Sequence, residues 1–110
     1  MCDFIKEMEV EIENGNFRLF KWINIDDQYN LSIQASGYSY STPRKNIDLE
    51  EYSNFEVAII KNGKFLTDKS ILNDFDKYDE LMEYKMDTQV FGYVPKKLVN
   101  DLYWYMIEKF

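Results

Sequence analysis

The stretch Tyr29–Arg44, YNLSIQASGYSYSTPR, begins with the pattern of a β-strand and ends with the composition of a loop. In residues 29–36 apolar and polar side chains alternate, which is the period of a strand with one buried face. Gly37 breaks this pattern, and serines and tyrosines follow it. We therefore expect a core strand over 29–36 and a candidate recognition loop over 37–44.

Two Asn-Gly pairs, Asn14-Gly15 and Asn62-Gly63, stand on either side of this stretch. Such a pair flanked by alternating apolar residues is typical of a hairpin with a type I′ turn, in which both central residues have positive φ. Each pair therefore predicts one hairpin. The expected strands are 8–13 and 16–23 around the first turn, and 55–60 and 64–67 around the second.

The C-terminal part of the chain predicts a strand over 89–94 and then a helix over 96 to about 109, which Pro95 opens at its first position. Residues 70–86 have apolar side chains at three- and four-residue intervals, which indicates either a helix or broken helical turns. The acidic residues 48–51 favour one helical turn at the end of a long loop. The apolar stripe expected on the C-terminal helix consists of Leu98, Val99, Leu102, Tyr103, Met106 and Phe110.

These elements together predict the fold class and the domain organisation. We expect an α+β fold, a mostly antiparallel sheet of five to six strands with the C-terminal helix packed on one face. We find no linker, repeat or low-complexity segment, and residues 1–110 are therefore expected to form a single domain.

The charge of the chain restricts its partners. The sequence holds 20 acidic and 13 basic residues, a formal net charge of −7. Direct binding to nucleic acid or to an anionic membrane depends on cations that neutralise phosphate, so both are disfavoured. An acidic protein of this kind is suited either to a solvated surface or to contact with a basic protein surface.

The residues that are missing exclude several kinds of chemistry and favour one location. Without histidine there is no Ser-His-Asp triad, no Cys-His pair and no imidazole base, and the common phosphate-binding glycine motifs are also missing. We predict a protein that is not an enzyme and that uses no cofactor or metal. The single cysteine, Cys2, and the lack of a long apolar run favour a cytoplasmic protein.

The first candidate surface is a row of glutamates in the strand expected over 8–13. Alternate strand residues repeat at about 6.8 Å, so a row of carboxylates could imitate the phosphates of a nucleic-acid strand toward a basic groove. The competing interpretation is an edge strand whose charges prevent pairing with other strands. The row consists of Glu7, Glu9, Glu11 and Glu13.

A second group of acidic residues lies between residues 74 and 83. Clustered carboxylates suit a hard cation, but the spacing fails the EF-hand pattern, because Asp79 stands where the loop needs glycine and Lys85 where it needs glutamate. An acidic face open to solvent or to a partner is the better interpretation. The group consists of Asp74, Asp76, Asp79, Glu80 and Glu83.

The third group contains aromatic residues and one arginine. Tyr38, Tyr40 and Arg44 lie in the serine-rich loop, and this composition is typical of recognition loops, although a loop that only covers the sheet edge has the same pattern. Trp104 falls on the polar face of the C-terminal helix, where it either packs against a neighbouring loop or anchors a partner.

Four short motifs resemble a family of short uncharacterised proteins encoded by phages and mobile elements. They are Gln34-Ala35-Ser36, Tyr40-Ser41-Thr42-Pro43-Arg44, Glu56-Val57-Ala58-Ile59 and Gly92-Tyr93-Val94-Pro95. The resemblance carries over no catalytic residue. It implies an anti-defence role, such as an anti-CRISPR inhibitor in the cytoplasm of the host cell.

The function that we expect is therefore that of an acidic inhibitor that occupies the basic nucleic-acid-binding surface of a nuclease or defence complex. The glutamate row and the second acidic group would supply the charge, and the aromatic residues with Arg44 would anchor the partner. Two alternatives stay open: a small-ligand or nucleotide-binding module that uses the 36–44 loop, and a structural accessory protein that forms a homodimer through Trp104.

Overall fold

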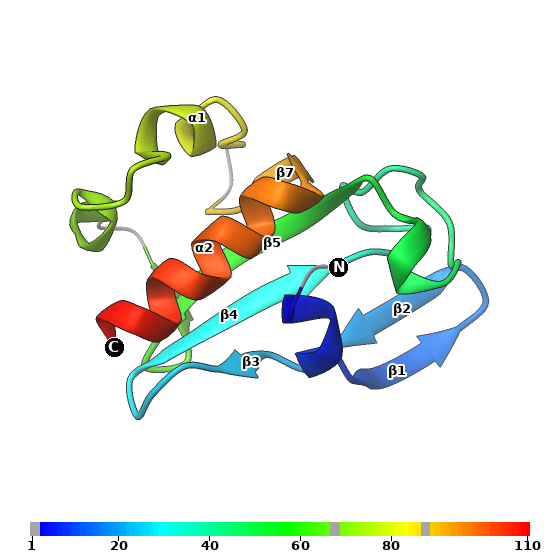
Figure 1. Cartoon of the computed structure of the whole chain (residues 1–110). Helices are drawn as coiled ribbons and strands as arrows, with labels where there is room; N and C mark the ends of the chain where they lie inside the picture. Colours follow the sequence, from blue (N-terminus) through cyan, green and yellow to red (C-terminus); the bar gives the residue numbers. More distant parts are fainter. Residues whose placement is uncertain (1–2, 67–68, 87–88) are drawn as a thin grey trace.

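The computed structural model describes residues 3–66, 69–86 and 89–110 and shows an α+β fold (Figure 1). The single cysteine, Cys2, and Thr67, the last residue of the strand expected over 64–67, lie outside the described residues. With η for a 3₁₀-helix, the elements are η1 (Asp3–Glu7), β1 (Val10–Asn14), β2 (Phe17–Phe20), β3 (Ile23–Asn24), β4 (Tyr29–Gln34), η2 (Leu49–Glu51), β5 (Asn54–Lys61), β6 (Lys64–Phe65), η3 (Lys69–Leu72), α1 (Tyr78–Met82), β7 (Phe91–Pro95) and α2 (Lys96–Lys109).

Within the described residues, two antiparallel sheets are formed, one of five strands and one of two. The larger sheet has the order β3-β4-β5-β6, and β7 also pairs with β5. In its centre Leu31 lies opposite Ile59 and Ile33 opposite Val57, and all four side chains are buried. The α+β prediction with a mostly antiparallel sheet is confirmed, and the strand predicted from the 29–36 pattern forms its centre.

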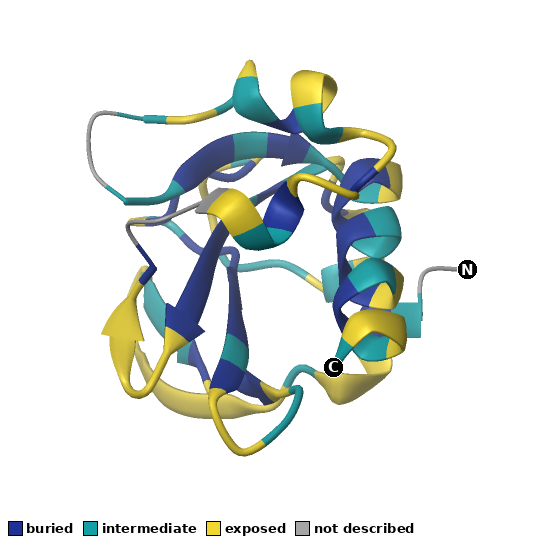
Figure 2. Ribbon diagram, turned by 90° about the vertical axis from the view of Figure 1, so that its left-hand side faces the viewer, coloured by how far each residue is buried: buried dark blue, intermediate teal, exposed yellow. Residues whose placement is uncertain are grey.

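The C-terminal helix α2 packs across one face of the larger sheet, as the apolar stripe predicts. Figure 2 shows the buried residues on the central strands and on the side of the helix that faces them. The helix spans Lys96–Lys109, as expected, but Pro95 is not its first helical residue, because Pro95 pairs with Asn54 of β5 and keeps an extended backbone as the last residue of β7. The stripe residues that are buried are Leu98, Val99, Leu102, Tyr103 and Met106.

The first hairpin differs from the prediction. The expected strand over 16–23 is two strands, since β2 pairs with β1 whereas β3 pairs with β4 of the other sheet. The turn is also displaced by one residue, because Asn14 pairs with Phe17 and remains in β1. Of the turn residues Gly15 and Asn16 only Gly15 has a positive φ, 60°, which is the pattern of a type II′ turn instead of type I′.

The second hairpin follows its sequence signal. Asn62 and Gly63 have φ values of 51° and 79°, so both central residues adopt the left-handed conformation that a type I′ turn requires. Beyond it, residues 70–86 form broken helical turns, η3 and α1, which is the second of the two alternatives that the spacing left open. The single helical turn expected over 48–51 is η2.

The β1–β2 hairpin is joined to the larger sheet through a side chain. The Gln34 amide accepts from the Phe20 N–H at 2.8 Å and donates to the Phe20 carbonyl at 2.9 Å, as a neighbouring strand would. Next to this junction, the Gly37 N–H donates to the Asn16 carbonyl at 2.9 Å. A Cβ at Gly37 would lie 2.6 Å from that oxygen, so only glycine allows this approach.

Candidate functional site

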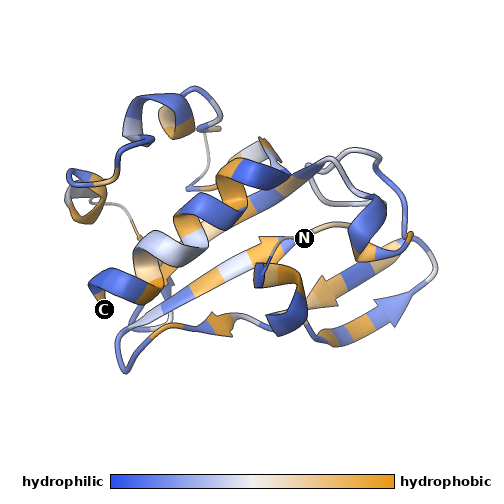
Figure 3. Ribbon diagram, viewed as in Figure 1, coloured by the Kyte–Doolittle hydropathy of each residue, from blue (hydrophilic) through white to orange (hydrophobic). Residues whose placement is uncertain are grey.

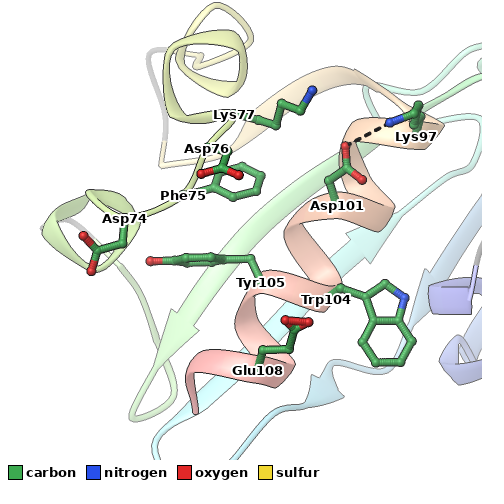
Figure 4. A pocket seen from close by; sticks show the side chains of 9 residues that line it. All are labelled: Asp74, Phe75, Asp76, Lys77, Lys97, Asp101, Trp104, Tyr105 and Glu108. Atoms are coloured by element: carbon green, nitrogen blue, oxygen red, sulfur yellow. Dashed lines mark hydrogen bonds and ion pairs between the residues drawn. The ribbon is translucent and has the colours of Figure 1, made fainter.

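A groove of about 340 Å³ lies along the outer face of α2 and is closed on its other side by residues 74–77, which connect η3 to α1 (Figure 4). The helix contributes side chains at three- and four-residue spacing, because such positions share one face of a helix. The residues that line the groove are Asp74, Phe75, Asp76, Lys77, Lys97, Asp101, Trp104, Tyr105 and Glu108.

Two aromatic rings form a fixed wall of the groove. The centroids of Phe75 and Tyr105 are 5.0 Å apart with an angle of 45° between the planes, and Phe75 is buried. The Tyr105 hydroxyl donates to the Ile71 carbonyl of η3, and the Phe75 N–H donates to the Leu72 carbonyl at 2.9 Å. These bonds hold the connecting segment against the helix, so the wall is preorganised.

More carboxylates than ammonium groups line the groove around this wall. Asp101 pairs with Lys97 at 3.4 Å. Asp76 and Glu108, in contrast, make no ion pair or hydrogen bond through their carboxylates among the residues that the structure describes. Figure 4 shows the Asp76 carboxylate above the Tyr105 side chain in that view, and the Glu108 carboxylate lower down and toward Trp104. The groove therefore keeps two negative charges beside an aromatic face.

One cationic side chain of the chain itself lies beside two of the residues that line the groove, Asp74 and Tyr105. The Lys109 Nζ lies 3.5 Å from a carboxylate oxygen of Asp74 and 5.8 Å from the centroid of the Tyr105 ring. A carboxylate and an aromatic face together attract a cation through its charge and through the quadrupole of the ring. The same combination, Asp76 and Glu108 around Tyr105, is suited to a cation from outside.

The groove brings together part of the acidic group predicted between residues 74 and 83. Asp74 and Asp76 line it, and Glu80 lines a continuing hollow of about 350 Å³ that shares Lys77, Lys97 and Asp101 with it. Asp79 and Glu83 lie on and at the end of α1, where they are exposed, and the structure does not place them in the groove.

Trp104 is packed against another part of the chain and is also partly exposed. Its side chain lines the groove and remains 42% exposed. Its indole N–H donates to the Asp3 carboxylate at 2.8 Å, and its ring contacts Tyr103 edge to face. The residue therefore packs against the N-terminal segment while part of its ring stays available to a partner.

The straight row of glutamates is not formed, and this expectation is corrected. Glu7 belongs to the 3₁₀-helix η1, and Glu9 precedes β1, where it pairs with Lys21 at 3.3 Å. A register shift between Val10 and Ile12 then interrupts the alternation, so Glu11 and Glu13 do not continue a regular two-residue repeat. The 6.8 Å spacing predicted for four carboxylates is therefore lost, although all four residues are exposed.

Glu7 instead lies near the C-terminal helix. Burial, and after it the charges of Glu7 and Asp3, raise the pKa of Tyr103 above its ordinary value of 10.0. This effect connects the N-terminal 3₁₀-helix electrostatically to α2.

The serine-rich loop uses most of its polar groups internally. The hydroxyls of Ser36 and Ser39 are 2.9 Å apart, and both residues are buried. Arg44 donates from Nε to the Ser39 carbonyl at 3.1 Å, and its guanidinium lies 5.4 Å from the Tyr40 ring. Tyr38 is 66% exposed. Of the predicted anchors in this loop, Tyr38 and Arg44 are exposed, and none of the three lines the groove.

Several residues of the groove were not among the predicted site residues, namely Phe75, Lys77, Lys97, Asp101, Tyr105 and Glu108. The spacing of Asp101, Trp104, Tyr105 and Glu108 on one helix face is a signal that the sequence contains. It did not identify a site, because the opposite wall comes from a segment whose position depends on the fold.

Two further observations concern the described part of the chain. No three histidine, cysteine, aspartate or glutamate side chains within it are grouped so that they could hold a metal ion. None of its helices has the length and apolar character that crossing a membrane requires. Comparison of the chain with protein-family models, with curated protein sequences and with solved structures finds no match in any of the three.

Proposed function

We propose that this protein is a non-enzymatic binding protein that attaches to a basic surface of another protein through the groove on α2. The observation that carries the proposal is the pair of carboxylates, Asp76 and Glu108, that have no partner among the described residues and lie beside the preorganised Phe75–Tyr105 wall. A partner arginine could place its planar guanidinium over a ring and donate to both carboxylates.

The magnitudes favour a contact that involves several groups. A cation over an aromatic face contributes about 0.5–2 kcal/mol, depending on how far it is desolvated. Exposed ion pairs contribute only about 0.2–1 kcal/mol each, because water and salt screen them. One arginine in the groove is therefore a weak anchor, and a partner with several basic residues is required for stable binding.

The resemblance to phage-encoded proteins suggests a class of partner. A nuclease or defence complex of the host presents a channel of basic residues that normally holds nucleic acid. A protein with a formal net charge of −7 would be attracted to such a channel and would compete with nucleic acid for it. The groove would supply the local contacts within this long-range attraction.

The test compares two charge-reversal variants that change the formal net charge by the same amount. One carries Asp76→Lys and Glu108→Lys in the groove, and the control carries Glu50→Lys and Glu51→Lys on the exposed helix η2. The ligand is a blocked hexa-arginine peptide, and the signal is the fluorescence of Trp104 in a Trp22→Phe background.

We expect the groove variant to lose about tenfold or more in affinity, equivalent to about 1.4 kcal/mol. The η2 control should lose much less, and binding of the unaltered groove should weaken steeply with salt. Equal losses in the two variants would mean that net charge alone is responsible. Either that result or a salt-insensitive affinity would contradict the proposal. A pull-down from host lysate with the same two variants then tests the natural partner.

A further inference from the structure

Within residues 3–66, 69–86 and 89–110, the strand β1 has a partner strand on one side only. It pairs with β2 in the two-stranded sheet, and all five of its residues are exposed. Figure 1 shows the hairpin at the end of the molecule away from α1. The other edge of β1 therefore presents backbone N–H and C=O groups that a further strand could bind.

Large apolar side chains are exposed on and beside the same hairpin. Val10, Ile12 and Trp22 are exposed by 43%, 49% and 45%. A hollow of about 350 Å³ next to them is lined by Glu11, Leu19, Phe20 and Trp22. Figure 3 shows the orange and blue bands that the apolar and charged residues form on β1. An edge strand with exposed β-branched residues is a surface that can be covered by another chain.

The charge of the hairpin determines which occupant fits. Glu9, Glu11 and Glu13 are all exposed at or within β1, and only Glu9 forms an ion pair among the described residues, with the exposed Lys21. In an antiparallel pairing of β1 with β1 of a second copy, glutamates would come to lie near glutamates, which is unfavourable. A strand that carries lysine or arginine next to Glu11 and Glu13 would instead be complementary.

We propose that β1 is a docking edge for an extended segment of a partner protein that carries both basic and β-branched residues. The segment adds an additional strand to the β1–β2 sheet through backbone hydrogen bonds. Its basic side chains lie near Glu11 and Glu13. Because the register shift places Val10 and Ile12 on opposite faces of the hairpin, its apolar side chains cover Val10 on one face and Ile12 on the other. This surface is separate from the groove on α2, and the inference does not depend on the function proposed for that groove.

The two tryptophans of the chain allow each surface to be observed separately. Trp22 lines the hollow at the hairpin and Trp104 lines the groove. In a Trp104→Phe variant the remaining fluorescence reports the hairpin, and in a Trp22→Phe variant it reports the groove. The probe is a blocked peptide of alternating lysine and valine, and the control is the same peptide with glutamate in place of lysine.

We expect the lysine-valine peptide to change the Trp22 fluorescence and the glutamate-valine peptide to leave it unchanged. Hydrogen exchange of the β1 amides that point away from β2 should slow at least tenfold with the bound peptide, because only strand addition protects the backbone. The double variant Glu11→Lys, Glu13→Lys should bind the lysine-valine peptide at least tenfold more weakly, whereas Glu50→Lys, Glu51→Lys should bind it with little change.

The outcomes separate the two surfaces and the two occupants. A peptide that changes only the Trp104 signal binds the groove, which overturns the docking edge and leaves the proposed function intact. Equal response to both peptides, or unchanged exchange at β1, overturns the proposal as well. A dimer in sedimentation that Glu11→Gln and Glu13→Gln strengthen, with no effect of either peptide, would assign the edge to a second copy instead.

Discussion

Replacement of Gln34 by leucine should detach the β1–β2 hairpin from the rest of the fold. The Gln34 side chain is 6% exposed, and its amide is bonded to both backbone groups of Phe20, a residue that is itself 2% exposed. The amide also donates to the Ser32 hydroxyl at 3.1 Å. Leucine has a similar size but no polar atoms, so Gln34→Leu leaves the Phe20 N–H and carbonyl buried without these partners.

The magnitude follows from the two backbone groups that lose their partners. A buried donor or acceptor without a partner costs about 1–3 kcal/mol, so the two together cost about 2–6 kcal/mol. The added apolar burial of leucine offsets part of this, which leaves an expected loss of about 3 kcal/mol. Domains of this size are stable by roughly 5–15 kcal/mol, and the variant should therefore remain folded but clearly destabilised.

Urea denaturation measures the loss, and hydrogen exchange shows where it occurs. The Phe20 amide and its neighbours in β2 should exchange faster, whereas the amides of β4 and β5 should change only with the global stability. The matched control is Gln28→Leu, the same chemical change at an exposed position in a turn, which should alter the stability by less than about 0.5 kcal/mol. A loss for Gln34→Leu below about 1 kcal/mol, or a loss equal to that of Gln28→Leu, would refute the reasoning.

Two further predictions concern the loop and the helix. Gly37→Ala places a Cβ 2.6 Å from the Asn16 carbonyl oxygen, so the loop and the hairpin turn must move apart. Urea denaturation should therefore show that the free energy of unfolding falls by about 1–3 kcal/mol. An unchanged stability would contradict the close approach of Gly37 to Asn16. The pKa of Tyr103 is raised by burial and then by the charges of Glu7 and Asp3, so the folded state holds this proton more tightly than the unfolded state does. The stabilisation is therefore complete below pH 10 and is lost as the pH rises through the folded pKa. Denaturation curves above pH 10 should fall less steeply for Tyr103→Phe than for the parent, whereas Tyr38→Phe, at an exposed position, should keep the parent's slope.

The sequence alone predicted those elements whose signals lie within a few residues. The second hairpin formed as expected, because Asn62 and Gly63 both tolerate the positive φ that a type I′ turn requires. The α2 stripe and the β4 strand were predicted for a similar reason, since periods of 3.6 and 2 residues are properties of the backbone itself. Charge and composition, from which we predicted a contact with a basic surface, can likewise be obtained from the sequence without knowledge of the fold.

Only the tertiary structure determined how residues far apart in the chain meet. Residues 16–23 have one continuous strand pattern, yet they form two strands that join different sheets, since β2 pairs with β1 and β3 pairs with β4. The glutamate pattern predicted a straight row, and the pairing of β1 with β2 introduced a register shift that interrupted it. Neither the division into two strands nor the register shift can be predicted from hydrophobic periodicity or strand propensity, since both depend on the partner strand.

The candidate groove shows the same division. The helix face that carries Asp101, Tyr105 and Glu108 follows from sequence spacing, and so does the acidic character of residues 74–77. That these two segments lie opposite each other depends on the Phe75–Tyr105 contact and on the bond from Tyr105 to the Ile71 carbonyl. Local sequence therefore determined the chemistry of each wall, and the packing of α2 against η3 and the following segment determined that they form one site.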